Sequence, residues 1–185
     1  MRVVGGELRG RRLAPFRGTR IRPTSDRVRE AVFNVIAARV RLEGLKGVLD
    51  LFAGTGAMGI EALSRGAEEA VFVDNDKGAV SVIERNIESC GLASRARVFK
   101  RTAAEAVRAL GALGERFDII FLDPPYRPSQ IEETLEDIRR AGLLNPGGMI
   151  IAEGSKREPL ETGAVGFELL DVRKYGDTAV YFFGG

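Results

Sequence analysis

Apolar and polar positions alternate in a regular order along most of this chain. Between residues 47 and 152, short runs rich in β-branched and aromatic residues predict strands, and stretches with apolar residues three or four apart predict helices. Parallel strands need a crossover that returns over the sheet, so this order predicts a doubly wound α/β fold with helices on both faces. The predicted strands are 48–52, 70–74, 97–100, 118–122 and 149–152, and the predicted helices are 57–65, 77–90, 102–113 and 130–141.

The C-terminal part of the chain has a different pattern. Residues 145–148 read Asn-Pro-Gly-Gly, which predicts a turn before the fifth strand. After Pro159, residues 166–173 and 178–183 predict two closing strands around the turn Tyr175-Gly176-Asp177. We expect these two strands to be antiparallel and to lie at one edge of the sheet.

The N-terminal part predicts a hairpin followed by one helix. Residues 2–13 alternate apolar and basic side chains between glycines, which indicates a strand or hairpin with one basic face. Thr24-Ser25-Asp26 offer N-cap side chains for a helix whose apolar stripe runs from residue 28 to residue 40. Arg27 and Arg29 are expected to lie off that stripe.

Charge is distributed unevenly along the chain. Residues 1–41 hold eleven arginines against three acidic residues, a net charge of +8, whereas residues 42–185 carry −6 and the whole chain +2. Arginine pairs with phosphate oxygens and releases counterions when it binds a polyanion. We therefore divide the chain into a basic arm, residues 1–23, and a domain, residues 24–185. On charge alone, the arm is either a polyanion-binding segment or simply solvated.

Composition excludes several kinds of chemistry. One cysteine and no histidine leave no disulfide, no Cys/His zinc site and no imidazole base, so we expect no metal. No apolar run approaches the roughly 20 residues that cross a bilayer. The N-terminus has basic residues without the apolar stretch of a secretory signal. We expect a cytoplasmic protein without a membrane partner.

A glycine-rich loop follows the first predicted strand. Gly54, Gly56 and Gly59 form a G-x-G-x-x-G pattern, which suits a dinucleotide or S-adenosylmethionine at a helix N-terminus. Asp50 would repel a pyrophosphate there but attract the ammonium group of a methionine moiety. Alternatively, Asp50 holds its own turn. Asp74 closes the second strand 18 residues after Gly56, a spacing that suits the ribose hydroxyls of either cofactor.

The fourth predicted strand ends in Asp123-Pro124-Pro125-Tyr126, a position that faces the cofactor crevice in such sheets. The prolines fix the backbone and remove N–H donors, so the local carbonyls and Asp123 present a rigid set of acceptors. Acceptors that hold the hydrogens of an exocyclic amino group favour a pyramidal nitrogen with its lone pair aimed at a methyl donor. Tyr126 offers a ring on which an unstacked base can lie. Asp123, Pro124 and Tyr126 are therefore the catalytic candidates for methylation of a nucleobase amine.

These motifs resemble those of a known family. Asp-Pro-Pro-Tyr following a Phe-Ala-Gly-Thr-Gly loop is similar to the amino-methyltransferases of nucleic acids. The chain as a whole resembles the RsmD-type bacterial 16S rRNA guanine-N2 methyltransferases over nearly its full length. The residues that carry this second resemblance are 2–6 with 9–11, 22–34, 50–56 and 61–67.

The resemblance implies a Rossmann-like class I methyltransferase sheet of seven strands, mostly parallel, with an N-terminal basic β-hairpin that helps to hold RNA. It implies transfer of a methyl group from S-adenosylmethionine to N2 of one guanine in small-subunit rRNA, within a 30S-like ribonucleoprotein particle. We expect the enzyme to be a monomer. The implied RNA contacts are Arg9, Arg11, Arg12, Arg20 and Arg22, although Arg22 and Thr24 are equally compatible with closing over the methionine end of the cofactor.

The resemblance also assigns the cofactor-binding residues by position. The glycine loop would frame the methionine part, and the end of the second strand would hold the ribose. Thr102 and Ala103 fall where the family contacts adenine, but an acidic or amide residue is more usual at the Thr102 position. A backbone contact from Ala103 is the alternative. The implied cofactor contacts are Asp50, Phe52, Gly54, Gly56, Asp74, Asn75, Thr102 and Ala103.

Three other functions remain open. A DNA adenine-N6 methyltransferase shares the Asp-Pro-Pro-Tyr chemistry, but so short a chain has no separate region for recognising DNA. A nicotinamide-dependent oxidoreductase shares the glycine loop and leaves residues 123–126 without a role. A ribosome-assembly factor without catalytic activity would use the basic arm and would not need a methyl-donor site.

Overall fold

The computed structural model describes residues 1–16, 25–124, 128–160 and 166–185. Its seven strands form one sheet in the order β3-β2-β1-β4-β5-β7-β6. The first five strands are parallel, and β7 runs antiparallel to both β5 and β6. The predicted antiparallel closing pair is confirmed, with β6 at one edge. The strands are β1 (Gly47–Leu51), β2 (Glu69–Asp74), β3 (Ala96–Lys100), β4 (Phe117–Leu122), β5 (Leu144–Ser155), β6 (Glu168–Tyr175) and β7 (Thr178–Gly184).

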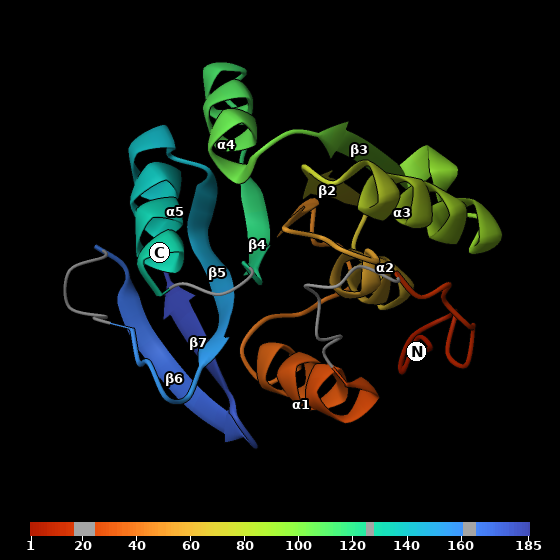
Figure 1. Ribbon diagram of the computed structural model, residues 1–185, viewed down its shortest axis with the longest axis horizontal. Coiled ribbons are helices and arrows are strands. Elements are labelled where there is room, and N and C mark those ends of the chain that lie inside the picture. The colour runs from red at the N-terminus through yellow and green to blue at the C-terminus, as the bar shows by residue number, and fades with distance from the viewer. Residues whose placement is uncertain (17–24, 125–127, 161–165) are drawn as a thin grey trace.

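Helices cover both faces of the sheet, as the alternation predicted (Figure 1). Successive side chains of a strand point to opposite faces. Phe72 and Phe121 therefore pack with α1, α2 and α3, whereas Val71 and Ile120 pack with α4 and α5. The helices are α1 (Asp26–Ala37), α2 (Ala57–Ser64), α3 (Lys77–Ser89), α4 (Ala103–Ala112) and α5 (Pro128–Ala141), with a 3₁₀ turn at Ala93–Arg95.

Pairing of β5 with β4 begins earlier than the sequence predicted. The segment 145–148, predicted as a turn before the strand, lies inside β5. Phe117 pairs with Leu144 and Ile119 pairs with Met149, so the extra residues of β5 form a bulge between two paired positions. The prediction of a strand starting at Met149 was wrong. Proline and glycine indicate a local bend, but they do not reveal that β5 already pairs with β4 at Leu144, before that bend.

Arg29 of α1 is buried, which contradicts the prediction that it lies off the packed stripe. The side chain has no exposed surface. Its guanidinium donates to the carbonyl of Arg2 and, at 2.9 Å, to Asp26, and its Nε lies 3.6 Å from a Glu61 carboxylate oxygen. Two of these acceptors, the Arg2 carbonyl and Glu61, come from other parts of the chain, so helical spacing alone does not reveal them. The predicted capping segment is confirmed at Ser25, whose Oγ accepts from the Val28 amide.

The N-terminal arm is not the predicted β-hairpin. Its two sides meet at one isolated antiparallel bridge between Arg2 and Arg12. The Val3 amide also donates to the Arg11 carbonyl within the arm, whereas the Val4 amide donates to Glu61 of α2 and the Glu7 amide donates to the Ser64 carbonyl, each at 2.8 Å. A Cβ on Gly6 would lie only 1.8 Å from that carbonyl oxygen. The glycine therefore permits close packing on α2, where some of the backbone donors of the arm are used instead of in a regular hairpin ladder.

In the part of the chain that the structure describes, none of the helices combines the length and the apolar character needed to span a membrane.

Candidate active site

The glycine loop between β1 and α2 lies at the carboxyl ends of the parallel strands and has an unusual backbone. Phe52 has a φ of 62°, and Gly54 and Gly56 have φ values of 58° and 76°. A left-handed conformation is uncommon for a bulky residue, costs on the order of 1–3 kcal/mol, and clusters at ligand sites. The Ala53 amide donates to the Val73 carbonyl at 2.9 Å, which fixes the loop against β2. The loop is therefore held in a bend that the two glycines permit and that Phe52 does not favour.

Gly59, the third glycine of the pattern, has a packing role. A Cβ at this position would lie 2.4 Å from the Phe72 ring of β2. Its amide donates to Asp50 at 2.9 Å. Gly59 thus lets α2 approach the sheet closely, which is the usual role of the third glycine in such loops.

Asp50 is almost completely buried at the base of the loop, with 4% of its surface exposed. Burial raises the pKa of Asp50 to about 7, and the charge of Asp74 acts in the same direction, while the Gly59 N–H opposes both. The bond to Gly59 means that Asp50 does hold its own turn. Its role toward a cofactor ammonium group remains a prediction, and a buried carboxyl group without a cation is suited to receive one.

Asp74 connects the glycine loop to the end of β2. One carboxylate oxygen accepts from the Gly54 amide at 2.8 Å, and the other accepts from the Asp76 amide at 2.9 Å. Each oxygen keeps a further lone pair, and the residue is partly exposed. Asn75 lies between Asp74 and Asp76, the N-cap residue of α3. This arrangement can accept from ribose hydroxyls while it holds the loop.

Asp123 and Pro124 follow β4, which lies between β1 and β5 in the sheet. Leu51 and Leu122 are paired across β1 and β4, so the glycine loop and Asp123 leave the sheet side by side. Burial raises the pKa of Asp123 well above its usual range, and the charges of Glu153 and Asp50 raise it further. Pro124 is buried. Tyr126, the third catalytic candidate, lies outside the described residues.

Thr102 forms the N-cap of α4. Its Oγ accepts from the Glu105 amide at 3.3 Å, and the Glu105 carboxylate accepts from the Thr102 amide at 2.9 Å, which is a capping box. The Thr102 side chain is thus engaged in capping the N-terminus of the helix. Ala103 begins α4, where amides have no partner within the helix. The backbone of Ala103 is therefore the better candidate for an adenine contact.

Among the candidate RNA contacts, Arg9 and Arg12 are exposed on the arm. Arg11 is also exposed, and its guanidinium donates to the Ser89 carbonyl at the end of α3. Arg20 and Arg22, with Thr24, lie outside the described ranges. The arm therefore presents at least two arginines outward, while a third is attached to the domain.

Asn86 of α3 is a residue that the sequence analysis missed. It is buried, accepts from the Ala14 amide at 2.7 Å, and donates to the Thr55 carbonyl of the glycine loop at 2.9 Å. One side chain thus joins the arm to the loop. The only signal in the sequence was an amide at a position of α3 that helical spacing places toward the sheet.

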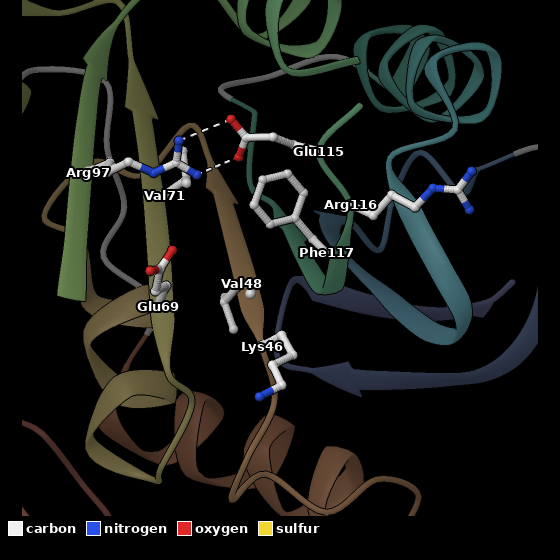
Figure 2. A pocket seen from close by; sticks show the side chains of 9 residues that line it. Lys46, Val48, Glu69, Val71, Arg97, Glu115, Arg116 and Phe117 are labelled. Atoms are coloured by element: carbon white, nitrogen blue, oxygen red, sulfur yellow. Dashed lines mark hydrogen bonds and ion pairs between the residues drawn. The ribbon is translucent and has the colours of Figure 1, made fainter. Parts of the chain in front are cut away.

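A cavity of about 280 Å³ lies at the opposite edge of the sheet, where the parallel strands begin. Val48, Val71 and Phe117 line it, and Arg97 and Glu115 are paired across its mouth (Figure 2). In sheets of this kind, ligands bind beyond the carboxyl ends of the strands. This cavity is separate from the candidate site.

Known proteins are similar to this chain over most of its length. Residues 1–184 match the family described as "Conserved hypothetical protein 95". The chain is 37% identical over 183 residues to "Putative rRNA methyltransferase YlbH" of Bacillus subtilis (strain 168), with 99% of this chain and 98% of that protein covered. It is 34% identical over 179 residues to "Ribosomal RNA small subunit methyltransferase D" of Escherichia coli (strain K12), with coverage of 97% and 87%.

Solved structures have the same architecture. "Putative methyltransferase yhhF from Escherichia coli" matches with a TM-score of 0.85 and 32% identity over 99% of this chain and 96% of that one. "Crystal structure of SMU.776, a putative methyltransferase complexed with SAH" matches with a TM-score of 0.66 and 17% identity over 80% and 48%, a likeness of fold alone. The mixed seven-stranded sheet is that of the class I methyltransferase fold.

Proposed function

Since the chain belongs to the family described as Conserved hypothetical protein 95 and is an S-adenosylmethionine-dependent methyltransferase, we propose that it methylates N2 of one guanine in small-subunit ribosomal RNA. The observation that carries the proposal is the adjacency of two elements. The glycine loop after β1 and the turn that begins at Asp123 leave neighbouring strands at the same edge of the sheet. A methyl donor seated on the first element would lie beside an amine held by the second.

The residues around the loop fit S-adenosylmethionine. The buried Asp50 carboxyl group suits an ammonium group, the Asp74 oxygens suit ribose hydroxyls, and the Ala103 amide suits an acceptor on adenine. When bound, the cofactor supplies an electrophilic methyl group on a positively charged sulfur. The charges of Asp50 and Asp74 act against each other, so a cation between them would stabilise this arrangement.

Asp123 is proposed to hold and then deprotonate the amine. N2 of guanine would form a bond to the methyl carbon in line with the carbon–sulfur bond, whose electron pair stays on sulfur. N2 becomes acidic as this bond forms, and its proton passes to Asp123 or to water. A carboxylate with a raised pKa is a stronger base than an ordinary one, so the environment of Asp123 favours this transfer. Tyr126 would carry the base on its ring.

Methyl transfer from labelled cofactor tests this function. The purified protein is incubated with small subunits from cells that lack the modification, with protein-free 16S rRNA, and with adenine-containing duplex DNA. We expect label in ribosomal RNA and its recovery as N2-methylguanosine after digestion to nucleosides. Label in DNA alone, or in another nucleoside of the RNA, would rule out the proposed substrate. Titration with nicotinamide cofactors is the control, and no binding is expected.

A further inference from the structure

Glu153 of β5 is a second carboxyl group beside Asp123 that the sequence analysis did not select. Leu122 of β4 pairs with Ala152 of β5, so Asp123 and Glu153 each follow one member of a paired position. Both residues are partly exposed, so both can reach a bound molecule. Glu153 thus lies beside Asp123, where β4 ends.

Glu153 faces the side of the sheet that carries α1, α2 and α3. Ile151 belongs to the hydrophobic cluster under these helices, and Glu153 comes two residues later on β5, where strand side chains repeat their direction. Asp123 follows β4 directly and lies near enough to Glu153 for the two charges to interact. Thr178 of β7 confirms this direction for Glu153, because its Oγ lies 3.5 Å from a Glu153 carboxylate oxygen.

Guanine differs from the other amino-bearing bases in what lies beside its amine. On guanine, the amine at N2 is next to N1–H, so two donors are adjacent. On adenine and cytosine, the amine is next to a ring nitrogen that carries a lone pair. Two adjacent carboxyl groups therefore match the guanine edge, whereas the second one would face a lone pair on adenine or cytosine. An acceptor that a bound base shields from water without donating to it is unfavourable.

We infer that Glu153 is a specificity-determining residue, which accepts the N1–H of the target guanine while Asp123 accepts from N2. This role rests on the proposed function and extends it, since it explains how the site selects guanine over adenine and cytosine. Burial raises the pKa of Asp123, and repulsion from the charge of Glu153 raises it further. Two donors on one rigid base relieve this repulsion.

The inference can be tested with one modified base. 2-Aminopurine keeps the 2-amino group, but its N1 carries a lone pair in place of a hydrogen. It is placed at the target position of a small subunit reconstituted with synthetic RNA, and rates are compared with those on guanine. We expect the wild type to prefer guanine by about 10- to 100-fold, the range for one unmatched buried acceptor.

Glu153→Gln is the decisive variant, because its amide can donate to the lone pair of N1. We expect this variant to be slower on guanine and to lower the preference for guanine over 2-aminopurine at least about 10-fold. 2-Aminopurine also lacks the O6 atom of guanine, but this difference affects the wild type and the variant equally. Glu168→Gln, the same change at an exposed position at the other end of the closing strands, should leave the preference unchanged.

Three outcomes decide the matter. An unchanged preference in Glu153→Gln, with turnover on guanine retained, would overturn the role of Glu153 and leave the proposed function intact. Equal loss on both bases would also overturn it, because a purely structural role predicts that result. A wild type that does not methylate guanine would overturn the proposed function itself. Calorimetric binding of S-adenosylhomocysteine, expected to be equal in wild type and variant, checks that Glu153→Gln is folded.

Discussion

Charged residues have opposite roles at the two ends of the parallel strands. At the edge where the strands begin, Arg97 is paired with Glu115 and holds the pKa of that carboxyl below its usual range (Figure 2). At the edge where the strands end, burial raises the pKa values of Asp50 and Asp123. The first edge satisfies its carboxylates within the protein and so contributes to stability. The second keeps carboxyl groups in an unfavourable state that a cation and amino hydrogens can relieve, which is typical of a functional site.

Strand β4 provides the sharpest test of this difference, because it has an aspartate near each end. Asp123→Ala should lower turnover by about 10²–10⁴-fold, since it removes the acceptor of the proton, while cofactor affinity stays nearly constant. Turnover is measured by methyl transfer and affinity by calorimetry. Retained turnover would remove Asp123 from the mechanism.

Asp118→Ala is the matched change at the other end of β4. Asp118 accepts from the amides of Lys46 and Gly47 at 2.6 and 3.2 Å and from the Asn145 side chain at 2.7 Å. Its loss should lower the free energy of unfolding by about 1–3 kcal/mol, because these donors lose their partner. Turnover below the melting temperature should be unchanged. If Asp118→Ala abolished turnover in a folded protein, the division between the two edges would be wrong.

Cofactor affinity should depend on pH through Asp50. Its raised pKa of about 7 means that the group is largely neutral in acid and ionised above that value. An ammonium group binds the ionised form, so affinity should rise by about 30-fold from pH 5.5 to pH 8 and then level off. In Asp50→Asn, affinity should be lower and nearly independent of pH. Calorimetry across this range measures both, and a flat profile in the wild type would contradict the role of Asp50.

The same pKa shift has a consequence for stability. Without cofactor, Asp50 ionises less readily in the folded state than in the unfolded state, whose pKa is near 3.8. Its contribution to stability is therefore present in acid and is lost as the pH rises toward 7. Bound cofactor should remove this loss, which thermal unfolding with and without cofactor will measure.

The arm gives a smaller effect that concerns RNA alone. Deleting residues 1–13 would also remove the buried side chains of Val3 and Leu13, so point variants are preferable. Arg9→Ala and Arg12→Ala should each weaken RNA binding and reduce the slope of log affinity against log salt by about 1. Affinity at several salt concentrations measures this. An unchanged slope would indicate that the arm has only a structural role.

The smallest effect is expected at Glu115. Its pair with Arg97 is partly exposed, so Glu115→Gln should lower the free energy of unfolding by at most about 1 kcal/mol at pH 7. The pKa of Glu115 is lowered from 4.5, so its contribution to stability is present above that pH and is lost in more acidic solution. Chemical denaturation at pH 7 and pH 3 checks this, and turnover should not change.

The sheet was predictable because its evidence is local. Each strand and helix has its own pattern, and the crossovers restrict how parallel strands connect. The errors involve partners far away in the chain. The hairpin prediction ignored Ser64 and Glu61, to which the arm donates, and the prediction for Arg29 ignored the same glutamate. Both Asp50 and Asp123 could be selected from motifs, whereas Glu153 has no motif and becomes visible only when β5 is paired with β4.

Asn86 determines how the arm can meet its ligand. Its side chain accepts from the Ala14 amide and donates to the Thr55 carbonyl, so the arm is fixed to the same helix that holds the bend after β1. The described arm is therefore a preshaped surface and not a free tail that wraps around RNA. Such a surface loses little conformational entropy on binding, and it can fit only a narrow range of RNA shapes. Recognition would then depend first on the shape of the folded ribonucleoprotein particle and only afterwards on contacts with a base.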